Sequence, residues 1–224
     1  MDENIEELEL ELEAASKRCA NAMAVLARKA SPQDWENYEL AHADELALER
    51  RLSAAKGEPY AISADFSVAW DIGAPMPFLL ASERKTFLAF YPRVHDPNWD
   101  GTYVTLVDPS SPLAEKLCFV TIEGCDSTRF GSPNDEVFEG HYLYGHGQEP
   151  YEAQIVMNSP WLREVLAINS VHARHNPDNW SDTKHFIFWF HDSTFECLAS
   201  SLTPEVVQDT MANLLVRLAG TLVG

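Results

Sequence analysis

Histidines and carboxylates gather in one part of this sequence, and these side chains do much of the acid–base chemistry of proteins near neutral pH. Six of the eight histidines lie between residues 141 and 191. Imidazole and carboxylate groups are ligands for zinc, iron or manganese, and they are equally the groups of general acid–base catalysis. The pattern predicts a metal site, a metal-free catalytic or ligand-binding pocket, or a structural network of satisfied polar groups, and all three alternatives stay open.

His191, Asp192 and Glu196 are the candidates for catalytic residues. They lie at the turn of a predicted hairpin, where His191 and Glu196 are diagonal neighbours with Cα atoms roughly 7–8 Å apart. We expect His191 to act as base or ligand, with Glu196 as its partner. The alternative is structural, because short turns rich in Asp and Ser are common for local hydrogen-bonding reasons.

Two further sets of residues complete the predicted site. The candidate ligand-binding residues are Asp135, Glu136 and Trp189, and the candidate metal ligands are His141, His146, His172 and His175. No HExxH sequence or other fixed metal-binding spacing supports the metal assignment. His172 and His175 also have a structural explanation, since histidine near the C-terminus of a helix interacts well with the helix dipole.

The element that must position these residues is the aromatic stretch 185–199. It predicts a strand at 185–190, a turn at Asp192 and Ser193, and a return strand at 194–199. That register sets Trp189 opposite Glu196. Side chains alternate across a strand, so one face of the hairpin is expected to form core: Phe186, Phe188, Phe190, Phe195 and Cys197.

The N-terminal part predicts two helices. Residues 2–29 carry a heptad-like seam at Ile5, Leu8, Leu12, Ala15, Cys19, Ala22 and Leu26. Ser31 and Pro32 then begin a second helix that ends near Lys56, before Gly57. We expect residues 1–57 to form a helical hairpin arm, through which the chain forms a homo-oligomer.

Residues 60–224 predict a separate domain. Strands are expected at 64–69, 86–91, 102–107 and 117–122 besides the hairpin, with helices at 160–170 and from Thr203 onward. The connections rich in proline and glycine favour antiparallel pairing. The predicted fold class is therefore α+β: an N-terminal helical hairpin followed by an antiparallel sheet of five or six strands with two packed helices.

Composition excludes several classes of function. The 35 acidic and 16 basic residues leave a formal charge of −19, so direct binding to nucleic acid is not expected. The sequence has no CxxC pair, no GxSxG elbow and no phosphate-binding glycine loop. It also lacks a membrane-spanning apolar run and a signal-peptide pattern, and we expect a cytoplasmic protein with reduced thiols.

Three segments resemble stretches of a bacterial protein family that has no assigned activity. They are Phe130 to Glu136 (FGSPNDE), Phe190 to Cys197 (FHDSTFEC) and Asn169 to His172 (NSVH). The resemblance covers roughly residues 70–200 and excludes the helical arm. It implies a bacterial cytosolic domain and assigns a role to no residue.

Two functions follow as hypotheses. The first is small-molecule binding or catalysis at a His/carboxylate pocket between the 130–147 loop, residues 172–175 and the 191–196 turn, with a divalent metal as an open alternative for the cofactor. The second is an acidic protein-interaction module of the immunity or adaptor type, without enzymatic activity, whose partner is a basic protein.

Overall fold

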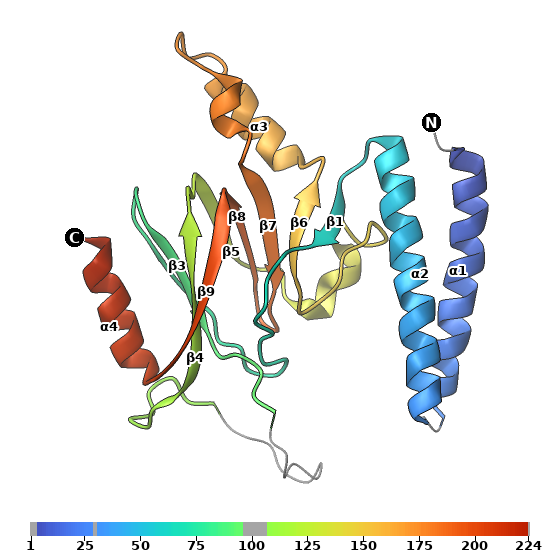
Figure 1. The fold of residues 1–224 in the computed structure, drawn as a ribbon, viewed down its shortest axis with the longest axis horizontal. Coiled ribbons are helices and arrows are strands. Elements are labelled where there is room, and N and C mark those ends of the chain that lie inside the picture. The colour runs from blue at the N-terminus through green and yellow to red at the C-terminus, as the bar shows by residue number, and fades with distance from the viewer. Residues whose placement is uncertain (1–3, 29–30, 96–106, 224) are drawn as a thin grey trace. The chain divides into compact units, whose positions relative to one another are not determined.

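A computed structural model describes residues 4–28, 31–95 and 107–223, and the chain divides into two compact units. The helical unit comprises residues 1–62, 139–149 and 156–160. The sheet unit comprises residues 63–138, 150–155 and 161–224. Figure 1 shows the helices and strands in their order along the chain.

Two long helices dominate the helical unit, as predicted. Helix α1 spans Ile5–Leu26 and helix α2 spans Pro32–Lys56. Ser31 and Asp34 form a capping box at the start of α2, with the Ser31 side chain accepting from the Asp34 N–H. Gly57 ends α2 in the left-handed conformation that glycine adopts without steric cost.

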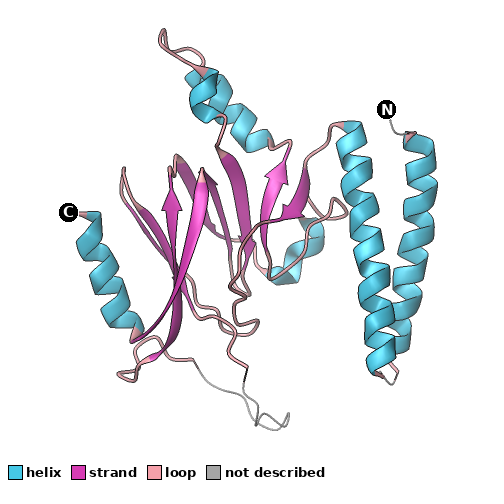
Figure 2. Ribbon diagram, in the orientation of Figure 1, coloured by secondary structure: helices cyan, strands magenta, loops and turns pink. Residues whose placement is uncertain are grey.

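The predicted seam of α1 is its packing surface against α2. Leu8, Ala15 and Cys19 are buried, whereas Ile5 at the end of the seam stays 38% exposed. Leu8 and Ala15 pack with Leu48 of α2, and the partly buried Leu12 and Leu52 complete the contact. Helix α2 runs back alongside α1 (Figure 2), and the apolar residues Leu8 and Ala15 of the seam are covered by α2 of the same chain.

Two antiparallel sheets form the sheet unit, so the predicted α+β class is confirmed. One sheet has the order β2-β3-β4-β9, from strands Phe78–Ala81, Thr86–Phe90, Glu115–Glu123 and Ser201–Asp209. In the other, consecutive neighbours are β6, β7, β8 and β5, which span Ala153–Met157, Lys184–Trp189, Thr194–Ala199 and Ser127–Gly131. The strands divide between two sheets, where a single sheet was expected.

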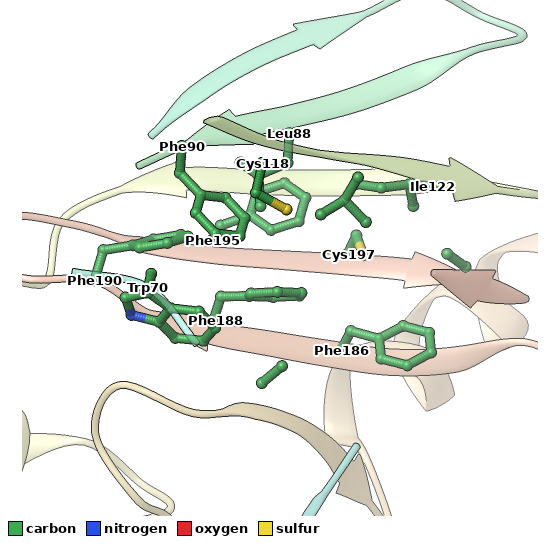
Figure 3. Close-up of a cluster of buried hydrophobic side chains, with 13 residues drawn as sticks. Trp70, Leu88, Phe90, Cys118, Ile122, Phe186, Phe188, Phe190, Phe195 and Cys197 are labelled. Atoms are coloured by element: carbon green, nitrogen blue, oxygen red, sulfur yellow. The ribbon is translucent and has the colours of Figure 1, made fainter. Parts of the chain in front are cut away.

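The core of the unit lies between the two sheets. Leu88 and Phe90 from β3 and Val120 from β4 meet the aromatic face of the β7–β8 hairpin (Figure 3). That face carries the five residues predicted for it: Phe186, Phe188, Phe190, Phe195 and Cys197. Trp70 lies among them, and its Nε1–H donates to the Trp189 carbonyl at 3.0 Å.

Helix α4 (Met211–Leu222) covers the other face of the first sheet. Strand β3 alternates between the two cores, since Phe87 and Ala89 pack with Leu214 and Leu218 of α4 while Leu88 and Phe90 face the second sheet. This double burial explains why every residue of β3 is buried.

The remaining described elements are short. Strand β1 (Tyr60–Ser63) follows α2, and helix α3 (Pro160–Asn169) begins at the predicted proline. Two 3-10 turns, η1 (Asp135–Gly140) and η2 (Pro177–Trp180), precede β6 and β7. None of the helices in the described ranges has both the length and the apolar character needed to cross a membrane.

Several predicted boundaries are wrong. The strand expected at 64–69 lies earlier, at 60–63, and most of the one expected at 102–107 lies outside the described residues. Residues from Thr203 belong to β9, not to a helix. Pro204 is tolerated because β9 is the last strand of its sheet, and α4 begins instead after Thr210, whose side chain accepts from the Asn213 N–H.

The register of the β7–β8 hairpin differs from the prediction by two residues. Trp189 pairs with Thr194, and Ile187 pairs with Glu196, because the turn spans residues 190–193 and is closed by the Phe190 N–H on the Ser193 carbonyl. A shift of two keeps each side chain on its predicted face and changes its cross-strand neighbour. That change alters the expected site.

Candidate functional site

His191 and Asp135 form a hydrogen-bonded pair at the surface of the sheet unit. Nδ1 of His191 lies 2.8 Å from Oδ2 of Asp135. The His191 side chain is 42% exposed and that of Asp135 is 16% exposed. A carboxylate accepts hydrogen bonds, so Nδ1 carries the proton of this bond. The neutral ring then has its basic electron pair on Nε2.

Backbone contacts bring these two residues together from distant parts of the sequence. The Asp135 N–H donates to the His191 carbonyl at 3.1 Å, and the Thr194 hydroxyl donates to the Pro133 carbonyl at 2.8 Å. Strand β5 pairs with β8 immediately before this point, with Gly131 opposite Thr194. The chain segments 130–136 and 190–197 therefore lie side by side.

The backbone conformation at position 131 favours glycine. Its φ of 131° lies in a region that residues with a Cβ rarely adopt, and a Cβ there would meet no atom within 4 Å. The constraint on this position is therefore the backbone conformation and not the space around it. Gly131 ends β5 and turns the chain toward Asp135.

Tyr151 is a second donor to Asp135, since its hydroxyl bonds to Oδ2. The Tyr151 backbone has a φ of 60°, which is uncommon for a large side chain and is found where surrounding contacts hold it. Burial, followed by the hydrogen bond to Asp135, raises the pKa of the Tyr151 hydroxyl to about 12. The hydroxyl therefore remains a proton donor near neutral pH.

The charges around His191 favour its protonated form. The hydrogen bond with Asp135 raises the pKa of His191, with further contributions from the charges of Asp192 and Glu136. Burial alone would raise the pKa of Asp135, but the hydrogen bonds from Tyr151 and His191 outweigh it and lower that pKa. Asp135 is thus a stable anion that holds and orients an imidazole.

Glu196 is not the partner of His191, and this expectation is corrected. Nε2 of His185 lies 2.8 Å from Oε2 of Glu196, because the register places His185 and Glu196 as diagonal neighbours on β7 and β8. The His185 side chain is fully buried and that of Glu196 is 13% exposed. The hairpin therefore contributes the histidine to two His–carboxylate pairs, one with a fully buried imidazole and one with an imidazole that is 42% exposed.

The buried pair belongs to a packed network. Trp161 of α3 contacts the His185 ring edge-on, with ring centroids 5.1 Å apart. The Arg129 guanidinium lies 4.0 Å from the centre of the Trp161 ring, and its nearest nitrogen is 3.9 Å from Glu196. The His185 ring is covered on this side by Trp161, while the Arg129 side chain remains 49% exposed.

Trp189, expected to contact a ligand, is fully buried. The Phe138 ring packs against it at 4.9 Å. Asp192 and Glu136, by contrast, are exposed residues whose charges act on His191. Asp135, Glu136, Asp192 and His191 are accordingly the predicted residues that the structure brings together.

The four predicted metal ligands contact residues other than His191 and Asp135. His141 and His146 belong to the helical unit, where Nδ1 of His141 is 3.0 Å from Gln148 and Nδ1 of His146 is 2.8 Å from Ser53. His172 and His175 belong to the sheet unit, where the His175 N–H donates to the His172 carbonyl. These contacts engage the imidazoles of His141 and His146 and the backbone of His172 and His175.

One group of three metal-ligand side chains occurs among the described residues, and sequence reasoning missed it. It consists of Cys19, His42 and Glu45 in the helical unit. Cys19 was assigned to an apolar seam, and His42 was not among the candidate residues. The i, i+3 spacing of His42 and Glu45 was the available signal. Tyr151 gave no signal in the sequence.

Comparison with protein-family models, with curated proteins and with solved structures found no match to this chain.

Proposed function

We propose that the sheet unit binds a small molecule and transfers a proton to or from it through His191. The observation that carries the proposal is the hydrogen bond between Nδ1 of His191 and Asp135 in a pair whose imidazole remains 42% exposed. A carboxylate that orients a solvent-accessible imidazole is the base half of many catalytic sites.

Each residue has a separate role in this proposal. Asp135 holds the tautomer with the proton on Nδ1, so that Nε2 accepts a proton from the ligand or from water. The imidazolium that forms is stabilised by the Asp135 charge. The Tyr151 hydroxyl holds the carboxylate, and neither it nor Asp135 needs to contact the ligand.

The surrounding charge indicates the class of ligand. Asp192 and Glu136 are exposed and add two carboxylates around His191. A cationic ligand, or one rich in hydroxyl or amine donors, suits these surroundings better than a phosphate or a carboxylate does. Amines, amino sugars and polyols are therefore the compounds to test first.

The test is a ligand screen read out at the histidine ring. Wild-type protein labelled in its histidine rings is titrated with a library of amines, amino sugars and polyols, with organic phosphates as the contrasting class. We expect a compound of the first class to shift the His191 resonances and to raise the melting temperature. Chromogenic esters and glycosides then test for turnover.

His191→Asn and Asp135→Asn are the informative variants, and His172→Asn is the matched control at an exposed histidine of the same unit. Binding must be lost in the first, weakened in the second and unchanged in the control. A ligand that binds all four proteins equally, or a screen in which no compound reaches His191, rejects the proposal.

The net charge of −19 favours a second candidate, an acidic module that binds a basic protein. Oligomerisation through the helical unit belongs to this candidate. It predicts an association that weakens as salt is added and that is indifferent to His191→Asn. A bacterial, cytoplasmic protein is likewise a proposal, which rests on the resemblance of segments 130–136 and 190–197 and on the scattered cysteines.

A further inference from the structure

Three side chains with metal-binding atoms meet between the two long helices of the helical unit. Sγ of Cys19, one imidazole nitrogen of His42 and one carboxylate oxygen of Glu45 all lie within 4.8 Å of one another. Cys19 is buried, and the other two are half-buried. A thiol, an imidazole and a carboxylate together form a ligand set for a transition metal and not a solvated acidic patch.

The helices place these residues together for simple geometric reasons. His42 and Glu45 are three residues apart on α2 and therefore share a face. Cys19 lies on the α1 seam, one turn beyond the fully buried Ala15. Alanines at 15 and 22 flank it on the seam, and small side chains leave room beside the thiol.

His42 is held in an orientation that suits a metal ligand. Its Nδ1 faces the Cys19 sulfur at 4.0 Å, while its Nε2 lies 3.4 Å from Oε1 of Glu149. A ligand histidine in proteins commonly donates its second N–H to a carboxylate, which fixes the tautomer and the ring direction. Tyr38 stacks on the same ring, with centroids 5.6 Å apart and planes 5° apart.

The orienting carboxylate is itself held. Arg50 lies 3.5 Å from Oε2 of Glu149 and also donates to the carbonyls of Ala61 and Gly147. The Gly147 N–H donates in turn to Glu49 at 2.8 Å. Glu149 is therefore fixed by the loop 139–149 and by α2, within the same unit.

We propose that Cys19, His42 and Glu45 bind one zinc ion, with Glu149 as the positioning residue for His42. Zinc bonds of about 2.3 Å to sulfur and 2.0–2.2 Å to nitrogen or oxygen place tetrahedral ligand atoms roughly 3.4–3.6 Å apart. The observed separations, within 4.8 Å, need only small side-chain rotations to reach this range. On binding, the thiol S–H bond breaks, its proton passes to solvent and a zinc–thiolate bond forms.

Three protein ligands leave the fourth position of a tetrahedral zinc to water or to another small ligand. This site lies in the helical unit, whereas the proposed proton-transfer site lies in the sheet unit. The two proposals rest on different residues, and the failure of one leaves the other standing.

Cobalt(II) is the probe for the test, because it takes zinc sites and is coloured. The full chain, purified without a histidine tag, is freed of metal with a chelator, reduced and titrated with cobalt(II) chloride. We expect one ion per chain, visible bands of a tetrahedral site and a near-ultraviolet charge-transfer band from thiolate to cobalt. Zinc should then displace cobalt and abolish the bands.

The variants separate the ligands from their support. Cys19→Ala should abolish the charge-transfer band. Glu45→Gln removes a ligand, so it should weaken cobalt binding by more than roughly 100-fold, the upper end of the effect of losing an orienting partner. Glu149→Gln should weaken binding by roughly 10–100-fold and keep the bands. Cys125→Ser and Glu39→Gln are the matched controls outside the site, and circular dichroism checks the helices of each variant.

Two outcomes overturn the proposal. One is the absence of saturable cobalt binding at one ion per chain. The other is cobalt binding that survives Cys19→Ala in a folded protein. If Cys125→Ser then removes that binding, the sulfur ligand is a different cysteine; if it does not, the site has no sulfur ligand.

Discussion

Two histidines of the same hairpin each form a 2.8 Å pair with a carboxylate, and the two pairs differ in what surrounds the imidazole. His185 and Glu196 are enclosed, and the edge of Trp161 covers the imidazole. His191 and Asp135 lie at the end of the same strands, where the imidazole is half-exposed. Both pairs thus share the hydrogen bond, and they differ in how far solvent or a ligand can reach the imidazole ring.

This difference teaches how a polar pair is assigned a role. A buried pair is held by neighbours on all sides, so its loss leaves a cavity and a desolvated partner. A pair whose imidazole is 42% exposed contributes less to stability, because water screens the imidazolium charge, and that imidazole can reach a ligand. The same residue types therefore predict a structural role at 185 and a chemical role at 191.

The largest expected effect is that of His185→Ala on stability. We predict a loss of about 2–4 kcal/mol in the free energy of unfolding, because the change opens a cavity at the fully buried His185 and takes a hydrogen-bond partner from Glu196, which is only 13% exposed. His191→Ala should cost less than about 1 kcal/mol. Urea unfolding followed by tryptophan fluorescence measures both, and equal losses would contradict the contrast between the two pairs.

A smaller effect is expected for Gly131→Ala. The φ of 131° is strained for alanine, which should cost about 1–2 kcal/mol although the space is open. Gly140→Ala is the control, because its added Cβ also meets nothing within 4 Å and its φ lies outside the strained range. Gly131→Ala should also shift the NMR resonances of the His191 ring and leave those of the His185 ring unchanged. A thermal melt in which both variants behave alike would show that position 131 does not need glycine.

The smallest effect is the pH dependence of the exposed pair. The pKa of His191 is raised above its ordinary value of 6.5, so its contribution to stability is complete below pH 6.5 and is lost as the pH rises through the raised pKa. The pKa of Asp135 is lowered from 3.8, so its contribution is present above pH 3.8 and is lost as the pH falls through the lowered pKa.

The stability difference between wild type and His191→Gln should therefore be largest between pH 3.8 and 6.5 and should stay below about 1 kcal/mol. Unfolding in urea across this range measures it. NMR titration provides a direct check, since Asp135→Asn should bring the pKa of His191 back toward 6.5. An unchanged His191 pKa in that variant would mean that Asp135 does not set its protonation.

Much of the fold could be predicted because it depends on local physical chemistry. The capping box at Ser31 and the left-handed Gly57 bound α2 as predicted. Alternation along the β7–β8 hairpin assigned Phe188 and Phe195 correctly to the core. The final helix was placed wrongly, because Thr-Pro-Glu is also compatible with an edge strand and only the pairing with β4 decides between them.

The candidate sites were predicted in part. The 130–147 loop and the 191–196 turn were expected to meet, and the structure brings Asp135 of the loop to His191 of the turn. The partners were wrong, because a register shift of two residues leaves every face unchanged while it moves Glu196 from the side of His191 to that of His185. Alternation carries no information about such a shift.

By itself, the sequence determined the two N-terminal helices, the apolar face of the β7–β8 hairpin and the residue types that can do chemistry, since those properties depend on neighbours a few positions away. Only the tertiary structure decided that Asp135 meets His191 across 56 positions and that Cys19 meets His42 across 23. The reason is physical. Contacts between distant segments depend on strand register and on the packing of helix faces, and both follow from the burial of the whole core.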